Sequence, residues 1–574
     1  MVMLPYGTMS LFEVLPEPPA EFAKELGAYN SWLRTLLYNR NITSQSAAES
    51  FLHPSYETEL HDPFLLHDME AAVVRILKAM TENQKIVIYS DYDCDGIPGA
   101  VVLHDFFVAA GFSNFYNQIP HRHYDGFGLS VKAVEKLLVE QKPALIITID
   151  CGTTDVEAVA KANELGIDVI ITDHHEPKEI LPKAVAIVNP KLGDTYPFTG
   201  LCGAAVIFKL VQALLARGNF MIAPGLEKWW LDMVGIATIA DMVPLRDENR
   251  TLAHYGLMVL RKSRRPGLQQ LLRKQKTSQQ HLTEDDIGFT IGPRINAASR
   301  MDTPEDAFFL LATKDEGEAG ARLEHLEKLN TDRKSAVAQM TKEIHVRLKD
   351  VEVMPEVIVM GNPEWRPSLV GLAANKLAEE YNRPAFLWGR DGNGVFKGSC
   401  RAGGGVSVVM LMNATPELFH EFGGHHASGG FSVRDERIHD LAAGLQGAYQ
   451  LLGTAAKIVE PLLVDMELTL EAFSTELLRA QRQCGPYGCE NRKPLYLISN
   501  VQAKEVVRFG KAKEHTKLTF ATTGIVKEAI AFFKTPEQFA IIPTTELPLS
   551  LLVHLEESFF MGRLQTRLRI VDIV

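Results

Sequence analysis

The sequence has few features of a secreted or membrane-embedded protein. Its 574 residues include six cysteines, and none of them forms a CxxC pair. Scattered thiols favour a reducing compartment, and Cys484 and Cys489 alone would make a weak metal site. No run of about eighteen uninterrupted apolar residues is present, which argues against a transmembrane helix. Because Glu13 and Glu17 come early and no basic segment precedes the first apolar residues, we also expect no secretory signal. These absences predict a cytoplasmic protein with no membrane partner.

Positive charge is also scarce over the chain as a whole. The net charge is −12, so any contact with a nucleic acid must be local. Two basic clusters stand out, RKSRRPGLQQLLRKQK at 261–276 and VRFGKAKEHTK at 507–517. Each could form an ordinary solvated face, but two such clusters in an acidic chain are consistent with a groove that follows a phosphate backbone.

Apolar strands alternate with helical stretches over residues 86–215. The segments KIVIYSD, ALIITID and DVIITDHH are typical of buried strands, which predicts a parallel sheet covered by helices on both faces. No GxGxxG or GxxxxGK[ST] motif follows the first strand, so a common nucleotide-binding fold is not indicated.

Each of these three strands ends in acidic residues or histidine. The carboxyl ends of parallel strands meet at one edge of a sheet, where ligands of α/β proteins bind. Crowded carboxylates repel one another unless a cation compensates them, and oxygen and imidazole ligands together suit Mg²⁺, Mn²⁺ or Zn²⁺. Taken singly, each residue could be a helix cap or turn former. Together they predict a site for one or two divalent cations, with these candidate ligands: Asp91, Asp93, Asp95, Asp150, His174 and, from an uncharged run, Asp241. Asp173 could instead orient the histidine pair.

The remainder of the chain predicts further domains. Residues 1–60 would form an N-terminal helical extension and 61–320 the main α/β domain. A long amphipathic helix over 321–350 would connect this domain to a second α/β domain at 351–460. Short alternating strands over 461–574 predict a small β-barrel.

The motifs DYDCDG, IDCG and TDHH resemble those of the DHH phosphoesterase superfamily. The chain is more closely similar to the RecJ exonuclease family, through IPHRHYDGFGL, ATIADMVPL, GPRINAASRM, GNPEWRPSLVGLAANKL, GSCRA and FGGHHASGG in that order. The resemblance spans residues 60–570 and implies an α/β fold: a parallel-sheet DHH domain, a smaller DHH-associated domain joined to it by a long helix, and a C-terminal OB-like β-barrel.

The resemblance implies a metal-dependent exonuclease that removes 5′ mononucleotides from single-stranded DNA in the 5′→3′ direction, in DNA repair and recombination. Two ions, Mn²⁺ or Mg²⁺, would bind the ligands named above, and Asp91 would lie beside the centre or share an ion. His175, with Asp173, would be catalytic, contacting the scissile phosphate or polarising the attacking water.

Substrate contacts are also implied by the resemblance. A 5′-phosphate pocket and strand-binding surfaces would include Arg122, Arg294, Asn296, Ser399, Arg401, Gly424, His425, Arg508, Lys511 and Lys517. Phe509 fits either base stacking or the barrel core, and we favour the core. The enzyme would act as a monomer on single-stranded DNA, with a single-strand-binding protein and a helicase as further partners.

The sequence departs from the family pattern at Ser299, at Ser368 and in GSCRA. None of these changes removes an expected metal ligand, but they bear on substrate preference and on the shape of the phosphate pocket. Two alternatives stay open: a DHH phosphodiesterase acting on short oligonucleotides, and a single-strand-binding scaffold with reduced catalysis. The expected C-terminal barrel argues against the first, and the full set of candidate ligands argues against the second.

Overall fold

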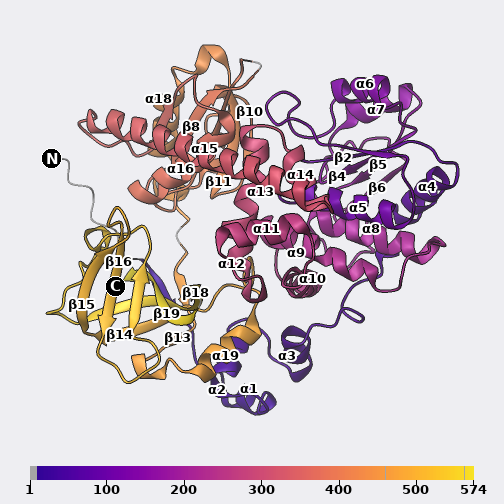
Figure 1. Ribbon diagram of the computed structural model, residues 1–574. Helices are drawn as coiled ribbons and strands as arrows, with labels where there is room; N and C mark the ends of the chain where they lie inside the picture. The colour runs from indigo at the N-terminus through magenta and orange to yellow at the C-terminus, as the bar shows by residue number, and fades with distance from the viewer. Residues whose placement is uncertain (1–9, 393, 459, 561–562) are drawn as a thin grey trace.

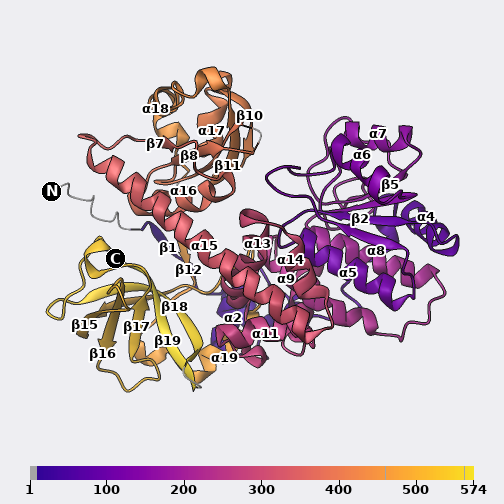
Figure 2. The same ribbon diagram turned by 45° about the horizontal axis from the view of Figure 1, so that its top comes forward.

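The computed structural model describes residues 10–392, 394–458, 460–560 and 563–574. The chain forms a large α/β body, a second α/β body and a β-rich body, drawn in indigo to magenta, in orange and in yellow (Figure 1). The long helix α15 (Glu316–Lys349) connects the first two and lies across the middle of the molecule (Figure 2). Its bounds lie close to the 321–350 expected from the sequence.

The first body is built on a parallel sheet with the strand order β3-β2-β4-β5-β6. The predicted strands are β2 (Ile86–Ser90), β4 (Leu145–Ile149) and β5 (Asp168–Thr172), and β2 and β4 are buried throughout. The outer strands, β3 (Phe115–Gln118) and β6 (Ala186–Val188), were not expected. Both are short and lack a long apolar run, so neither has a strong sequence signal.

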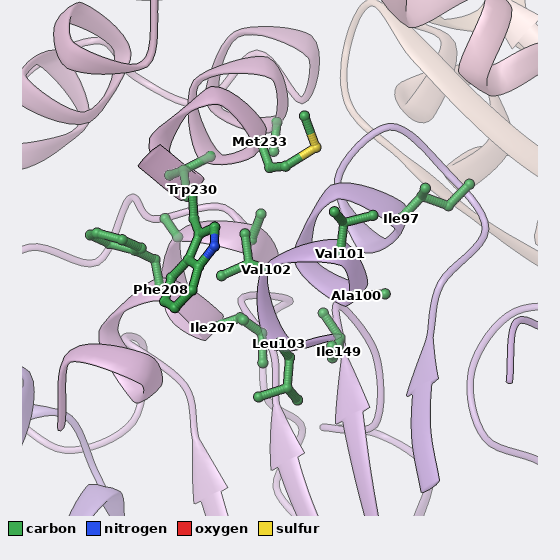
Figure 3. Close-up of a cluster of buried hydrophobic side chains, with 14 of the residues drawn as sticks. Ile97, Ala100, Val101, Val102, Leu103, Ile149, Ile207, Phe208, Trp230 and Met233 are labelled. Atoms are coloured by element: carbon green, nitrogen blue, oxygen red, sulfur yellow. The ribbon is translucent and has the colours of Figure 1, made fainter. Parts of the chain in front are cut away.

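Helices cover both faces of this sheet, as predicted. One face packs on α4 (Met69–Thr81), α5 (Gly96–Ala109) and α8 (Gly203–Arg217), and the other on α6 (Val131–Glu140) and α7 (Val156–Glu164). Figure 3 shows the interior of the first face, where side chains of α5 meet Ile207, Phe208, Trp230 and Met233. Buried apolar area of this kind provides most of the stability of such a body.

Further helices extend the first body toward α15. They are α9 (Leu231–Ala240), α10 (Asp247–Leu260), α11 (Pro266–Gln275), α12 (Glu284–Asp286), α13 (Gly292–Met301) and α14 (Glu305–Ala312). None of the helices in the described part of the chain is long and apolar enough to cross a membrane.

The second body contains a five-stranded mixed sheet with the order β10-β11-β9-β8-β7. Its strands are β7 (Ile358–Gly361), β8 (Ala385–Arg390), β9 (Phe396–Arg401), β10 (Phe419–Gly424) and β11 (Ser428–Val433). Helices α16 (Pro367–Tyr381), α17 (Val408–Asn413) and α18 (Leu441–Leu452) complete it. This is the second α/β unit that the sequence predicted.

The β-rich body is one sheet with the order β13-β14-β18-β19-β17-β16-β15. The strands are β13 (Met466–Glu467), β14 (Tyr496–Val501), β15 (Ala503–Phe509), β16 (His515–Phe520), β17 (Glu528–Ala531), β18 (Leu549–Phe560) and β19 (Arg563–Ile573). In the described residues β13 and β15 stay unpaired on their outer sides, so the strands of the expected OB-like barrel form an open sheet. Local alternation predicts strands, but closure depends on long-range pairing.

The N-terminal segment is part of this last body. Strand β1 (Phe12–Val14) pairs in parallel with β12 (Leu462–Val464). Helices α1 (Ala20–Glu25), α2 (Ser31–Tyr38) and α3 (Gln45–Leu52) share a core with α19 (Thr475–Cys484). The helical extension is therefore docked between the first body and the β-rich one.

Candidate metal centre and phosphate pocket

The ends of neighbouring strands bring the expected acids and histidines together. The Asp91 N–H donates to Ile149 O (3.0 Å), and the Asp150 N–H donates to Thr172 O (2.9 Å), so the chain leaves β2, β4 and β5 in register. The residues form three overlapping sets, and within each set the ligand atoms lie within 4.8 Å of one another. The sets are Asp91, Asp93 and Asp150; Asp95, His174 and Asp241; and Asp150, His174 and His175. All six expected metal ligands belong to this cluster.

His174 lies at the centre of the cluster. Its Nε2 is 3.1 Å from Asp150 Oδ1, 3.6 Å from Asp95 Oδ2 and 3.7 Å from Asp241 Oδ2. The ring also hydrogen-bonds the Leu201 carbonyl, a contact typical of metal-binding histidines because it fixes the ring orientation. Burial lowers the pKa of His174 to about 4, which keeps the imidazole neutral and able to bind a cation.

Two helix N-termini hold the carboxylates of the DxDxDG segment. Asp93 Oδ1 accepts from the N–H groups of Asp95 (2.8 Å) and Gly96 (3.2 Å) at the start of α5. Both carboxylate oxygens of Asp95 accept hydrogen bonds from the start of α8, where the donors are the N–H groups of Gly203 (2.6 Å) and Ala204 (2.7 Å). Helix N-termini attract negative charge, so these contacts fix both side chains on one rim.

Asp150 is held in an unusual backbone conformation. Its φ is +60°, in the left-handed region that is uncommon for a residue with a Cβ. Gly203 packs against it so closely that an added Cβ would lie 2.6 Å from the Asp150 Cβ. Strain of this kind persists where the surrounding structure over-determines it, and it directs the Asp150 carboxylate into the cluster.

The electrostatics of the cluster fit a divalent cation. Burial and neighbouring acids raise the pKa of Asp95 to about 7 and that of Asp241 to about 8, and they raise the pKa values of Asp91 and Asp150 as well. Among the residues that the structure describes, the buried oxygens Asp91 Oδ1 and Asp150 Oδ1 have no hydrogen-bond partner. Unpaired buried oxygens are costly unless a positive ion contacts them, so the donor set fits Mn²⁺ or Mg²⁺.

His175 lies beside this cluster with one ring nitrogen already occupied. Its Nδ1 is 2.7 Å from Asp173 Oδ1. The pKa of Asp173 is lowered overall, because its contacts with His175 and Thr153 outweigh the opposite effect of burial. The pKa of His175 is raised overall, because the contact with Asp173 outweighs the lowering by burial. Asp173 therefore favours a protonated His175 whose Nε2 is available.

The loop of the DGFGL motif also reaches His175, a contact that the sequence did not predict. The ring centroid of Phe127 lies 5.3 Å from that of His175. The Leu129 N–H donates to Asp155 Oδ2 (2.6 Å), and the Tyr89 hydroxyl donates to Gly128 O (3.0 Å). The buried Tyr89 and the half-buried Asp155 thus anchor the loop, and a Cβ at Gly128 (φ +79°) would lie 2.6 Å from Asp155 Oδ2.

A cluster of arginines adjoins the metal ligands. Arg300 is half-buried, and desolvation together with the charges of Arg122, Arg333 and Arg401 lowers its pKa to about 10, while Asp93 acts in the opposite direction. Four guanidinium groups with so little compensating negative charge make this cluster a candidate site for an anion. The sequence predicted Arg122 and Arg401 here; it missed Arg300 and Arg333, which come from α13 and α15.

The second body contributes Arg401 to this candidate phosphate pocket. Ser399 and Arg401 on β9 face Gly371 of α16, where an added Cβ would lie 3.3 Å from both Ser399 Oγ and Arg401 Nη2. Gly424, the last residue of β10, has φ +146°, and the following His425 N–H donates to Ser428 O (2.7 Å) in the turn to β11. The GSCRA segment and the SLVG segment therefore meet at one point.

Comparison with known proteins agrees with this geometry. Family models match the DHH family N-terminal domain over residues 85–238, the DHHA1 domain over 354–453 and the RecJ OB domain over 464–572. The single-stranded-DNA-specific exonuclease RecJ of Salmonella typhimurium is 32% identical over 75% of this chain and 78% of that protein. The chain belongs to the RecJ family.

Other RecJ proteins extend the comparison. RecJ of Haemophilus influenzae is 30% identical over 82% of this chain and 84% of its own length; RecJ of Bacillus subtilis is 34% identical over 89% of this chain, which spans 64% of that relative. The crystal structure of Thermus thermophilus RecJ in complex with Mn²⁺ matches with a TM-score of 0.81 at 25% identity, over 98% of this chain and 79% of that one.

Other residues expected from the RecJ resemblance lie in different surroundings. Arg294 is buried, and its guanidinium contacts Glu327, Thr290 O and Gln275, so it is already paired. Asn296 lies on α13, where its carbonyl accepts from the Ser299 hydroxyl. Arg294 is thus engaged inside the protein rather than presented to a ligand.

The expected bases of the OB domain lie on β15, β16 and the turn between them. Arg508 pairs with Glu537, Lys517 lies 3.3 Å from Glu528, and Lys511 is exposed. Phe509 is half-buried and contacts His515 and Phe532, at centroid distances of 5.0 and 6.2 Å, so it lies in a small aromatic cluster outside the main core.

The basic segment 261–276 is only partly available for phosphate. Arg265 is buried between Asp105 and Asp232, Arg261 donates to Leu282 O, and Lys274 pairs with Glu324. The remaining bases lie on α11 and the preceding turn. Three of the seven bases in this segment therefore stabilise the helical part of the first body.

Proposed function

We propose that this RecJ-family chain is a metal-dependent exonuclease that hydrolyses single-stranded DNA from its 5′ end and releases 5′ mononucleotides. The observation that carries the proposal is the proximity of two sites: the Arg122 guanidinium lies 4.9 Å from the ring centroid of Tyr92, the residue between the proposed metal ligands Asp91 and Asp93, and the charge of Asp93 acts on Arg300. A pocket that accepts a terminal phosphate would place the first internucleotide bond over the metal ligands. The RecJ relatives are single-stranded-DNA-specific exonucleases, which supports the same assignment.

The residues proposed to hold two Mn²⁺ or Mg²⁺ ions are Asp91, Asp93, Asp95, Asp150, His174 and Asp241. The ions would supply charge neutralisation on the phosphodiester and activation of water. We propose that His175 contacts the scissile phosphate through Nε2, because Asp173 occupies Nδ1 and favours the protonated ring. A donor at this place stabilises the charge that develops on the phosphate oxygens.

Substrate binding is assigned to the pocket and to the β-rich body. Arg122, Arg300 and Arg401, together with Ser399, would bind the 5′ phosphate, since guanidinium groups contact phosphate oxygens in a bidentate way. Gly424 and His425 would border the strand, and Arg508, Lys511 and Lys517 would follow its phosphates further on. Arg294 and Asn296 would act by supporting α13.

The proposal also covers the protein's location, oligomeric state and partners. We propose a cytoplasmic monomer that acts in DNA repair and recombination, with a single-strand-binding protein and a helicase as partners. The RecJ resemblance supports these assignments.

A product assay tests the proposal. Single-stranded DNA, a blunt duplex, matched RNA and oligomers of two to four nucleotides would be incubated with Mn²⁺ or Mg²⁺, and nucleoside 5′-monophosphates would be quantified. Release from single-stranded DNA but not from the duplex is expected. Release confined to the short oligomers would favour the alternative small-oligonucleotide phosphodiesterase, and strand binding without any release would favour the scaffold.

A further inference from the structure

A fourth strand of the sheet also ends at the catalytic rim. Asn189 follows β6, one strand beyond β5 and its histidine pair, and its side chain is completely buried. Its Oδ1 accepts from the Lys191 N–H (2.9 Å), which fixes which end of the amide donates. The Nδ2 group therefore points to the opposite side, toward the histidine loop.

The amide donates to two acceptors that both belong to the surroundings of His175. Nδ2 lies 3.0 Å from His175 O and 3.1 Å from Thr153 Oγ1. The Thr153 N–H donates to Asp173 Oδ2 (3.0 Å), and the Thr153 side chain also hydrogen-bonds this carboxylate. Asp173 Oδ1 in turn contacts His175 Nδ1. Asn189 thus holds His175 twice, at its backbone directly and at its ring through Thr153 and Asp173.

Packing alone does not fix the His175 ring, because the side chain is 45% exposed. Its orientation depends on the hydrogen bonds just described, and a displacement of about 1 Å from productive geometry is enough to slow a reaction strongly. We propose that Asn189 is a positioning residue that sets the orientation of His175 without contacting substrate. This inference rests on the proposed function, since it concerns the residue assigned to the scissile phosphate.

Two substitutions of Asn189 separate the effect of losing its hydrogen-bond donor from the effect of losing side-chain packing. Asn189→Ala removes the amide, whereas Asn189→Asp keeps its size and the acceptor for the Lys191 N–H but turns an oxygen toward His175 O. In the full-length protein with Mn²⁺, both should lower kcat on 5′-phosphorylated single-stranded DNA by about 10- to 100-fold. KM for DNA and the Kd for Mn²⁺ measured by calorimetry should stay within about twofold, because ligands and pocket are unchanged.

A double-mutant cycle distinguishes positioning from a general structural effect. If Asn189 acts through His175, then Asn189→Ala should change kcat by less than about twofold in a His175→Ala background. An equal loss of kcat in both backgrounds would overturn the inference, as would unchanged kcat in both single variants. Should Asn189→Ala fail to fold, Thr153→Val and Thr153→Ser provide the same test: valine should lower kcat, and serine should restore it.

Asn491 offers a matched control. It is a buried asparagine whose Nδ2 donates to Cys484 O (2.9 Å) and Pro486 O (2.7 Å), away from the rim. Asn491→Ala should lower the melting temperature without changing kcat. A wild-type protein that releases no nucleotide from single-stranded DNA would contradict the proposed function itself. Wild-type release with unaffected Asn189 variants would contradict only the positioning role.

Discussion

At the scale of single residues, the cluster of carboxylates is costly to the protein when no cation compensates it. Asp241 shows this most clearly, because burial and the neighbouring Asp95 and Asp93 raise its pKa to about 8. In the unfolded chain the same group ionises near its ordinary value. Its contribution to folding is therefore most favourable below about pH 4 and is lost as the pH rises through about 8.

Asp241→Asn should consequently stabilise the metal-free protein at alkaline pH. With EDTA at pH 8.5, we expect its melting temperature to exceed that of wild type by at least about 2 °C, and the difference should vanish toward pH 4. Mn²⁺ should reverse the order, because the wild type binds the ion more tightly. If, in EDTA, the variant is less stable than wild type at every pH, the ionised Asp241 carboxylate does not destabilise the metal-free protein, and the prediction is wrong.

Arg401 provides a test of the phosphate pocket. Arg401→Gln should raise KM for 5′-phosphorylated single-stranded DNA by about tenfold, which is the loss of affinity expected when one charge-assisted hydrogen bond is removed. KM for the same strand with a 5′ hydroxyl should change little, since no terminal phosphate is present to bind. The control is Arg437→Gln, which removes an exposed arginine of the same body that pairs with Asp440. Equal losses on both substrates would assign Arg401 to the strand rather than to its end.

Sequence reasoning at this scale works where a local rule applies. Residues at the ends of apolar strands could be predicted to share a rim, and Asp93, Asp150 and His174 do. Arg300, Arg333 and Asn189 could not, because their positions depend on how α13, α15 and β6 approach the rim in the folded chain. Arg294 shows the converse, since a motif arginine is engaged by Glu327 of a helix distant in sequence.

At the scale of elements, the close crossing of α9 and α10 positions Asp241. Gly235 and Gly256 lie in contact, and a Cβ at Gly256 would lie 2.5 Å from the Gly235 Cα. Backbones can approach this closely only where no side chain intervenes. Asp241 follows the last residue of α9, so a shift of this helix moves a proposed metal ligand.

Gly256→Ala should therefore cost stability and metal affinity together. We expect a loss of about 2–3 kcal/mol in the free energy of unfolding, as in other overpacked interiors, and weaker Mn²⁺ binding by calorimetry. Gly447 lies in α18, where no atom of the described part of the chain comes within 4 Å of the position a Cβ would take, and Gly447→Ala should be neutral or stabilising by up to about 1 kcal/mol. Normal Mn²⁺ affinity in a destabilised Gly256→Ala protein would contradict the link between this crossing and the site.

The elements themselves were predictable in proportion to their apolar pattern. Long buried strands such as β2 and β4 and the long helix α15 have strong periodicity, whereas β3 and β6 are short edge strands without it. The C-terminal strands alternate as expected, yet β13 and β15 do not pair with each other in the described residues. Pairing across the sheet is a long-range property that no local window contains.

At the scale of the whole molecule, the N-terminal extension joins the first body to the β-rich one. Arg250 of α10 donates from Nε to Phe51 O (2.7 Å), from Nη1 to Cys484 O (3.3 Å) and from Nη2 to Gly485 O (3.1 Å). One buried guanidinium thus satisfies carbonyls from two segments outside its own body. The relative placement of the two bodies depends on this contact.

Arg250→Leu should loosen the β-rich body. It leaves buried carbonyls unpaired, at a cost of about 2–3 kcal/mol, and should increase hydrogen exchange over residues 465–501. Arg246 lies nearby and pairs with Glu490 at the surface, so Arg246→Leu should change stability by less than about 1 kcal/mol. Unchanged exchange in Arg250→Leu would mean that other contacts hold the bodies together.

The polarity of digestion tests the central claim most directly. A 3′-labelled single strand with a 5′ phosphate would be followed over time with Mn²⁺, beside the same strand with a 5′ hydroxyl and beside the Asp150→Ala protein. The account predicts stepwise shortening from the 5′ end that retains the label, proceeds faster with the 5′ phosphate and is absent in Asp150→Ala. Release of the 3′ label as a mononucleotide at the earliest times, or internal fragments, would contradict it.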